Sequence, residues 1–228
     1  ANERFTITFN GEIYNYKELK ADLKKLGHVF ETESDTEVLL TCWAEWGEGC
    51  LRKLIGMFAF SIYDKKYNKL FCVRDAFGIK PLYFSSSNET FSFSSEIQSL
   101  LNIIPNKPGL NFKYIYDYLA YGDYDKDENT FYDGVFQLKP GHIMELNLSD
   151  GYKIISNKRW WWPNIEEKNN ITFSQAVDEL RERFLHNIRL HLRSDVSVGL
   201  ALSGGLDSSA IACAVRHLYP NQEINTFS

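Results

Sequence analysis

The segment LALSGGLDSSAIA, residues 200–212, constrains the fold most, because an apolar run stops at two glycines and an alanine-rich apolar segment follows. The preceding SVGLAL, residues 197–202, is nearly all apolar, as in a strand covered on both faces. We expect a helix over roughly Ser208–His217 and a second strand at INTFS, the last five residues. Strand, loop, helix and strand in this order predict the opening of a parallel α/β domain.

The loop in this segment is suited to an anion. Unpaired N–H groups and the positive end of a helix dipole favour phosphate, and glycines let a ligand approach the backbone. The loop has neither the G-K-[ST] of a Walker A motif nor a GxGxxG dinucleotide fingerprint. Asp207 would repel a phosphate unless Mg²⁺ bridged the two. The alternative is an ordinary turn in which Asp207 only supports the helix start.

The first part of the chain alternates between strand and helix patterns. FTITF, residues 5–9, alternates apolar and polar residues and predicts a strand. Leucines at helical spacing predict a helix over Tyr16–Gly27, and an acidic start with a glycine stop predicts another over Asp35–Gly47. HVFET, residues 28–32, is interpreted as a short strand between them.

The middle of the chain consists of hairpin-like pieces. MFAFSIYD and KLFCVRD flank a polar KKYN turn, and PLYFSSS and TFSFSS flank Asn88-Glu89. FQLKPGHIMELN breaks at Pro140-Gly141, another turn signal. Repeated hairpins with a few helices predict a largely antiparallel sheet structure with helices packed on it.

The composition of the sequence changes near Trp160, where a polar, proline-containing stretch follows three tryptophans. We place a domain boundary there and expect one domain over residues 1–160 and another over 165–228. Thr172 with Gln175 fits a capping box, and apolar residues then recur at helical spacing, which predicts a long helix.

Composition excludes several classes of protein. The formal net charge of −5 gives no electrostatic basis for binding nucleic acid or an anionic membrane surface. No apolar run approaches the ~20 residues of a membrane span. The N-terminus has no signal-peptide pattern, and no CxxC pair occurs among the cysteines, which are Cys42, Cys50, Cys72 and Cys213. We therefore expect reduced cysteines and a cytoplasmic protein.

Asn10-Gly11, directly after the first predicted strand, has two interpretations. The dipeptide is a hairpin-turn signal, but the residues after it predict a helix and not a returning strand. A strand ending in Asn-Gly also presents a side-chain amide and an accessible backbone N–H together. Two such donors suit an oxyanion hole for acyl transfer.

Six motifs in order resemble the glutaminase domain of class II amidotransferases, as found in the glutamine-hydrolysing asparagine synthetase family. They are FNGEIYN, ESDTEVLL, GMFAFSIYD, RDAFGIKPLYF, FSSEIQSLL and KPGH. SGGLDSS resembles the pyrophosphate loop of ATP-pyrophosphatases. The resemblance implies an α+β, N-terminal-nucleophile-like αββα sandwich. After it comes the start of an α/β ATP-pyrophosphatase domain of the adenine nucleotide α-hydrolase-like type.

The resemblance implies roles for two groups of residues. Asn10 and Gly11 would form the oxyanion hole. Together with Glu12 they would also line the glutamine pocket. Asp35 would hold the substrate's α-amino group. The ATP-binding residues would be Leu202, Ser203, Gly204, Gly205, Leu206, Asp207, Ser208 and Ser209, with Mg²⁺ as a candidate partner of Asp207. For Arg74, Asp75 and Lys80 we favour a structural ion-pair cluster over direct catalysis.

The implied reaction is ATP-dependent. Glutamine supplies ammonia, aspartate or another carboxylate acceptor is adenylated, and ammonia displaces AMP; a homodimer is one expected assembly. Three alternatives stay open: an amidotransferase with another acceptor, such as one of surface-polysaccharide synthesis; a β-lactam-forming synthetase; and a non-catalytic nucleotide-binding or partner-binding module. The Asn10, Gly11 and Asp35 matches argue against the β-lactam-forming enzyme.

The chain departs from the family at its ends. The family's nucleophile is an N-terminal cysteine, which is absent here, since the sequence starts at Ala1 just before the first strand. We therefore expect an internal piece of a larger enzyme that is inactive alone. Exposed sheet edges should make such a piece poorly soluble or self-pairing.

Overall fold

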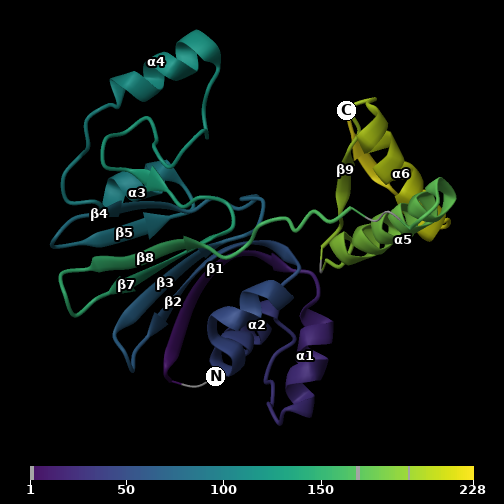
Figure 1. Cartoon of the computed structure of the whole chain (residues 1–228), viewed down its shortest axis with the longest axis horizontal. Coiled ribbons are helices and arrows are strands. Elements are labelled where there is room, and N and C mark those ends of the chain that lie inside the picture. Colours follow the sequence, from purple (N-terminus) through teal and green to yellow (C-terminus); the bar gives the residue numbers. More distant parts are fainter. Residues whose placement is uncertain (1–2, 168–169, 195) are drawn as a thin grey trace. The chain divides into compact units, whose positions relative to one another are not determined.

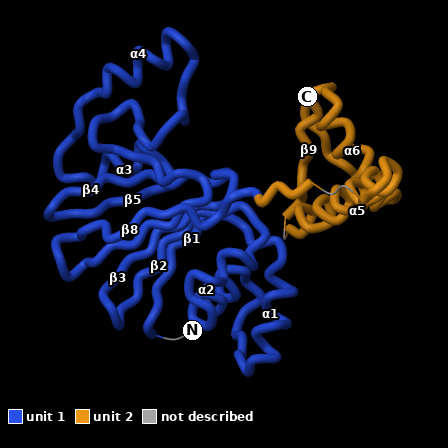
Figure 2. The backbone as a smooth tube through the Cα atoms, viewed as in Figure 1, with its two compact units in different colours: residues 1–163 blue, residues 164–228 orange. Residues whose placement is uncertain are grey.

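A computed structural model describes residues 3–167, 170–194 and 196–228. The chain divides into two compact units, Ala1–Pro163 and Asn164–Ser228 (Figure 2). Each unit has its own helices and strands.

Unit 1 contains two antiparallel sheets. The larger sheet has the order β1-β2-β3-β7-β8, with β1 Phe5–Ile13, β2 Gly56–Asp64, β3 Lys69–Arg74, β7 His142–Asn147 and β8 Lys153–Arg159. The smaller sheet has the order β5-β4-β6, with β4 Tyr83–Ser86, β5 Phe91–Ser94 and β6 Phe136–Gln137. The predicted antiparallel structure is therefore confirmed.

Helices cover both sheets of unit 1. α1 (Tyr16–Lys25), α2 (Asp35–Trp46) and the short helix η1 (Gly47–Lys53) lie on the β1–β2 side of the large sheet (Figure 1). α3 (Ile97–Ile103) contacts β4 and β5 of the small sheet. α4 (Phe112–Tyr121) follows α3 along the chain.

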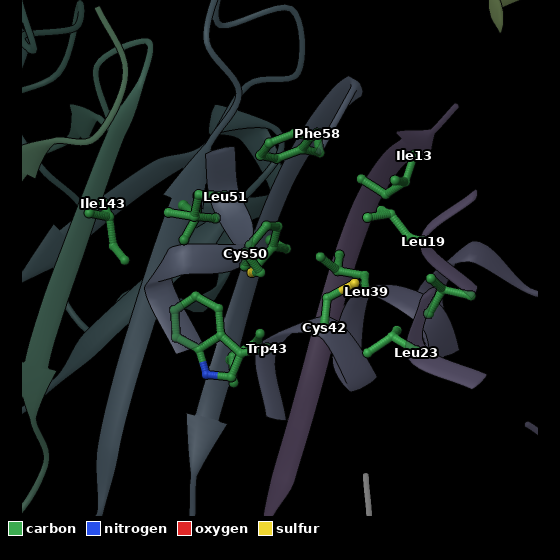
Figure 3. Close-up of a cluster of buried hydrophobic side chains, with 14 residues drawn as sticks. Ile13, Leu19, Leu23, Leu39, Cys42, Trp43, Cys50, Leu51, Phe58 and Ile143 are labelled. Atoms are coloured by element: carbon green, nitrogen blue, oxygen red, sulfur yellow. The ribbon is translucent and has the colours of Figure 1, made fainter. Parts of the chain in front are cut away.

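Two hydrophobic clusters lie between these layers and hold them together. The first joins α1 and α2 to the large sheet, and Figure 3 shows Trp43 and Leu39 within it. Trp43 packs there edge-on against Phe60 with ring centroids 6.1 Å apart. The second cluster joins the two sheets through residues such as Ala59, Leu82 and Met144. Each large apolar side chain buried in this way contributes about 1.5–3 kcal/mol. The order helix, sheet, sheet, helix is the expected αββα sandwich.

Three details of the strand predictions for unit 1 are wrong. β1 does not end before Asn10-Gly11 but runs through both to Ile13, because all nine residues pair with β2. The segment 28–32 is not a strand, because Glu37 binds the N–H groups of Glu31 and Thr32 through its carboxylate. Pro140-Gly141 does not close a hairpin, because β6 and β7 belong to different sheets.

Unit 2 has two helices and two parallel strands. They are α5 Phe173–His191, β9 Gly199–Ala201, α6 Leu206–Leu218 and β10 Asn225–Phe227, with β10 pairing parallel to β9. The Thr172–Gln175 capping box is present. The strand expected over residues 197–202 is only three residues long and is not covered on both faces, since Gly199 and Ala201 are exposed.

No helix within the described ranges is long and apolar enough to cross a membrane.

Candidate functional site

Gly11 lies inside β1 and not in a turn. Its φ of +150° is a conformation that other residues rarely adopt. A Cβ built on Gly11 would lie 2.1 Å from the carbonyl oxygen of Met57, so the close approach of β1 to β2 requires glycine. This requirement was not evident from sequence, because the contact is with a residue on another strand.

The hydrogen-bond alternation of the sheet shows where the Gly11 N–H points. Gly11 is opposite Phe58 of β2. The N–H and C=O of Phe58 are both bonded to Asp75, on the side of the sheet away from β1. In an antiparallel pair a residue opposite such a position makes no ladder bonds with it, so the Gly11 N–H points out of the free edge of β1.

Asp35 meets the same edge of β1. It is the first residue of α2, whose N-cap Ser34 accepts a hydrogen bond from the Thr36 N–H at 3.2 Å. The Asp35 Oδ2 atom accepts the Ile13 N–H at 2.9 Å. Ile13 is two residues from Gly11, so the two edge N–H groups are roughly 7 Å apart along the strand. The edge therefore carries an N–H donor and a carboxylate at neighbouring positions.

Asn10 and Glu12 lie on the opposite face of β1 from the helix-packed Phe9 and Ile13. Asn10 lines a cavity of about 140 Å³ together with Ala59, Ser61, Leu82 and Phe93. This cavity lies at the inter-sheet face. Glu12 is half-buried. Burial raises the pKa of Tyr14, and the negative charges of Glu12 and Asp75 add to that rise.

The side chains of Arg74 and Asp75 form hydrogen bonds mainly with backbone groups. The Asp75 carboxylate accepts four backbone N–H groups, those of Phe58, Phe77, Ile79 and Lys80. Arg74 donates to the Lys80, Gly78 and Leu138 carbonyls and to the Gln137 amide. Hydrogen bonds of these two side chains to the backbone thus hold the loop after β3. The Lys80 side chain forms no recorded ion pair among the described residues.

The SGGLDSS loop of unit 2 joins β9 to α6. The Leu202 N–H donates to the Phe227 carbonyl of β10 at 2.7 Å, and Gly204 has a φ of +76°. The Ser203 and Ser208 hydroxyls are 3.1 Å apart, and Ser208 also donates to the Gly205 carbonyl. Asp207 is exposed in the first turn of α6.

The start of α6 fits a phosphate-bearing ligand. Its N-cap is Gly205, which has no side chain to satisfy the N–H groups of the first turn. Ser203, Gly204, Gly205 and Asp207 are exposed, while Ser208 and Ser209 are half-buried. Free backbone donors, hydroxyl groups and one carboxylate are the donor set that a phosphate with Mg²⁺ needs. Leu206 is 86% exposed at the same loop.

Three of the four cysteines are buried in unit 1. Cys42, Cys50 and Cys72 are buried, and burial raises the pKa of Cys42 and of Cys72 to about 12. These thiols are therefore protonated at neutral pH and are poor nucleophiles. Among the described residues no cluster of His, Cys, Asp and Glu could hold a metal ion.

Sequence reasoning missed two features that position Asp35: the hydrogen bond it accepts from the Ile13 N–H, and the capping of α2 by Ser34. The string Ser34-Asp-Thr-Glu37 contains the capping-box spacing, which could have identified Ser34 as the helix start. Nothing local predicts the Ile13 bond, because it joins β1 to α2 across 22 residues.

The αββα layers of unit 1 are consistent with a protein of the glutamine amidotransferase class, and a family match shows that class. Residues 1–161 match the glutamine amidotransferase domain family, and the chain belongs to this family. Residues 179–228 match the asparagine synthase family.

Curated relatives cover nearly all of the chain. Asparagine synthetase [glutamine-hydrolyzing] 3 of Bacillus subtilis is 37% identical over 94% of this chain and 34% of its own length. Asparagine synthetase [glutamine-hydrolyzing] 1 of the same organism is 36% identical over 100% of this chain and 35% of its own. The chain thus spans about a third of the length of these relatives. Among solved structures, glutamine PRPP amidotransferase from B. subtilis matches 100% of this chain and 46% of its own, with 16% identity and a TM-score of 0.49.

Proposed function

We propose that this chain is part of a glutamine-dependent asparagine synthase, in which unit 1 binds glutamine and unit 2 binds ATP. Matches to the glutamine amidotransferase domain and asparagine synthase families support the two assignments. The observation that carries the glutamine assignment is the shared edge of β1, where the Gly11 N–H lies roughly 7 Å along the strand from the Ile13 N–H that binds the Asp35 carboxylate.

Glutamine suits this edge because one end of the molecule needs hydrogen-bond donors and the other end needs a negative charge. Its carboxamide oxygen becomes negative during acyl transfer and needs N–H donors, here the Gly11 N–H with the Asn10 side-chain amide. Its α-ammonium needs an anion, here Asp35. Two methylenes and the α-carbon separate these groups in glutamine. Glu12 adds a second carboxylate beside them.

These residues bind and orient glutamine, and the attacking nucleophile is not one of them. Burial keeps Cys42 and Cys72 protonated, so neither supplies it. Released ammonia would then react with an activated carboxylate acceptor, which we propose is aspartate.

The SGGLDSS loop would hold the phosphates of ATP. The α6 N–H groups and the hydroxyls of Ser203, Ser208 and Ser209 would donate to phosphate oxygens. Leu202 and Leu206 would flank the nucleotide. Asp207 would bind Mg²⁺ and so neutralise the repulsion between its carboxylate and the phosphates. The acceptor carboxylate would attack the α-phosphorus of ATP and expel pyrophosphate, and ammonia would then attack the acyl carbon of the acyl-adenylate and displace AMP.

The test is Asp35→Asn in the full-length protein, with asparagine and pyrophosphate formation measured with either glutamine or ammonia as nitrogen donor. Removing a charge-assisted contact of about 1.5–3 kcal/mol should raise the KM for glutamine roughly tenfold to hundredfold. Ammonia-dependent synthesis should be unchanged. Asp150→Asn, in the exposed turn before β8, is the matched control.

An unchanged KM for glutamine would refute the role of Asp35. Pyrophosphate release that does not depend on aspartate, but does depend on another carboxylate or amine, would refute aspartate as the acceptor.

A further inference from the structure

A second cavity of unit 1 lies away from the β1 edge. Its volume is about 370 Å³, within the range of small-molecule sites. None of the residues proposed to bind glutamine lines it. The loop after β3, the loop after α4 and the β6–β7 connection form its walls.

Arg74 supplies a buried positive charge to this cavity. The residue is only 8% exposed, and its hydrogen bonds go to three carbonyl oxygens and the Gln137 amide oxygen. All four acceptors are neutral, and no ion pair of Arg74 occurs within the described part of the chain. One N–H of its Nη2 group remains for a ligand. The Asp75 and Asp125 carboxylates attract the Arg74 charge without bonding to it, so the guanidinium has no hydrogen-bonded counter-ion and favours an anionic group at the cavity.

Arg159, at the end of β8, places a second guanidinium at the same cavity. Although exposed, it is held in place, because Nε donates to the Trp161 carbonyl at 3.0 Å and the guanidinium lies 3.6 Å from the Trp162 ring centroid. Its two Nη groups have no recorded partner among the described residues. His142 is directly opposite in the strand register, and its Nε2 atom is likewise left for a ligand.

Two carboxylates line another part of the cavity. Asp125 Oδ1 accepts a bond from the Gln137 Nε2 at 3.0 Å, and its N–H is held by the Tyr114 hydroxyl at 2.8 Å. Asp127 accepts the Asn129 N–H. Neither carboxylate forms an ion pair in the described residues. Since Gln137 bonds Arg74 through its oxygen and Asp125 through its nitrogen, its amide stands between the two charges and keeps them apart.

The other two cations of the lining form their ion pairs with other carboxylates, although Lys126 also acts on Asp127 electrostatically. Lys126 is paired with Asp117, and Lys139 is paired with Glu128. The cavity therefore keeps a cationic part, at Arg74 and Arg159, and an anionic part, at Asp125 and Asp127. A simple anion or a simple cation would leave one of these parts unpaired.

We propose that this cavity binds a free apolar α-amino acid, with its carboxylate at Arg74 and Arg159 and its ammonium at Asp125 and Asp127. A zwitterion is the small ligand class that supplies both charges. Phe77 and Pro140, which also line the cavity, offer an apolar wall for the side chain. This site is separate from the proposed glutamine site and from its reaction.

The test is titration of the full-length protein with L-leucine, followed by calorimetry and by tryptophan fluorescence. Trp162 stacks on Arg159, so a ligand carboxylate at Arg159 should change the indole emission. N-acetyl-L-leucine lacks the ammonium and L-leucinamide lacks the carboxylate. Saturable binding of leucine at millimolar concentration or tighter, with at least tenfold weaker binding of both analogues, is expected.

Substitutions of residues that line the cavity test whether leucine binds there. Arg159→Gln and Asp127→Asn should each weaken leucine binding about tenfold or more, whereas the exposed Arg52→Gln and Asp150→Asn should not change it. The KM for glutamine should stay the same in Arg159→Gln. Equal binding of N-acetyl-leucine or inorganic phosphate would overturn the proposal in favour of a simple anion site. Absence of leucine binding, or its loss in Asp35→Asn, would also overturn it.

Discussion

Gly11 is the residue at which backbone conformation and close packing coincide. Gly11→Ala would force a φ of +150° on a residue with a side chain and would place its Cβ against the Met57 carbonyl. We expect a loss of about 3 kcal/mol or more in the free energy of unfolding, because the clash involves backbone that cannot move without breaking the β1–β2 ladder. Urea denaturation followed by circular dichroism measures it.

Gly27→Ala separates the cost of a positive φ from the cost of a clash at the added Cβ. Gly27 also has a positive φ, of +95°, but a Cβ there meets nothing within 4 Å. Its replacement should cost only the conformational strain, about 1–2 kcal/mol. Equal losses for Gly11→Ala and Gly27→Ala would show that the contact with Met57 is unimportant.

Asp64 makes the stability of unit 1 depend on pH. Arg4 donates to it at 2.9 and 2.6 Å, and this bonding, more than any other cause, lowers the pKa of the Asp64 carboxyl. The carboxylate thus stabilises the fold above the unfolded value of about 4, and its contribution is lost as the pH falls through the lower folded value.

Asp64→Asn should therefore be less stable than the parent at pH 7, and the difference should shrink as the solution is acidified below about pH 4. The effect is modest because the Arg4 side chain is 40% exposed. Urea midpoints across the pH range measure it, with Asp150→Asn as the control. A difference that stays constant down to the lowest pH would contradict the assignment to this pair.

At the scale of elements, the N-terminus of α2 contributes both to stability and to the proposed glutamine site. Ser34 caps α2, and Asp35 follows it directly. Ser34→Ala should cost about 1 kcal/mol of stability through loss of the cap and should also raise the KM for glutamine, because Asp35 loses its fixed position. Ser34→Asp, which keeps a cap acceptor, should restore most of the stability. A destabilised Ser34→Ala with unchanged KM would show that the Ile13 bond alone positions Asp35.

The elements that sequence predicted are those with local signals. The α5 start follows from Thr172 and Gln175, and the β2–β3 hairpin follows from alternation around a polar turn. The course of β1 through Asn10-Gly11 could not be predicted, because pairing of these two residues with Ala59 and Phe58 overrides a local turn signal. Likewise the meeting of Asp35 with Ile13 depends on packing of α2 against β1. The candidate site was predictable as a set of residues through family resemblance, but its geometry was not.

At the scale of the whole molecule, the proposed function assigns one step to each unit. The proposed glutamine site depends on strand pairing inside unit 1, and the proposed phosphate loop depends on a strand–helix junction inside unit 2. Damage to one site should therefore remove one activity without unfolding the other unit. Two glycine-to-alanine variants with similar positive φ, one inside the proposed ATP site and one outside it, test this expectation directly.

Gly204→Ala should abolish ATP-dependent pyrophosphate release in the full-length protein with either glutamine or ammonia as nitrogen donor, while glutamine hydrolysis persists. The reason is that φ at Gly204 is +76°, so alanine would move the loop backbone away from the phosphates. Gly122→Ala is the matched control, since Gly122 has a φ of +72° at the end of α4 and, like Gly204, open space around a Cβ. Both variants should lose about 1–2 kcal/mol of stability, and only Gly204→Ala should lose pyrophosphate release. Equal activity in the two variants would remove the SGGLDSS loop from the proposed ATP site.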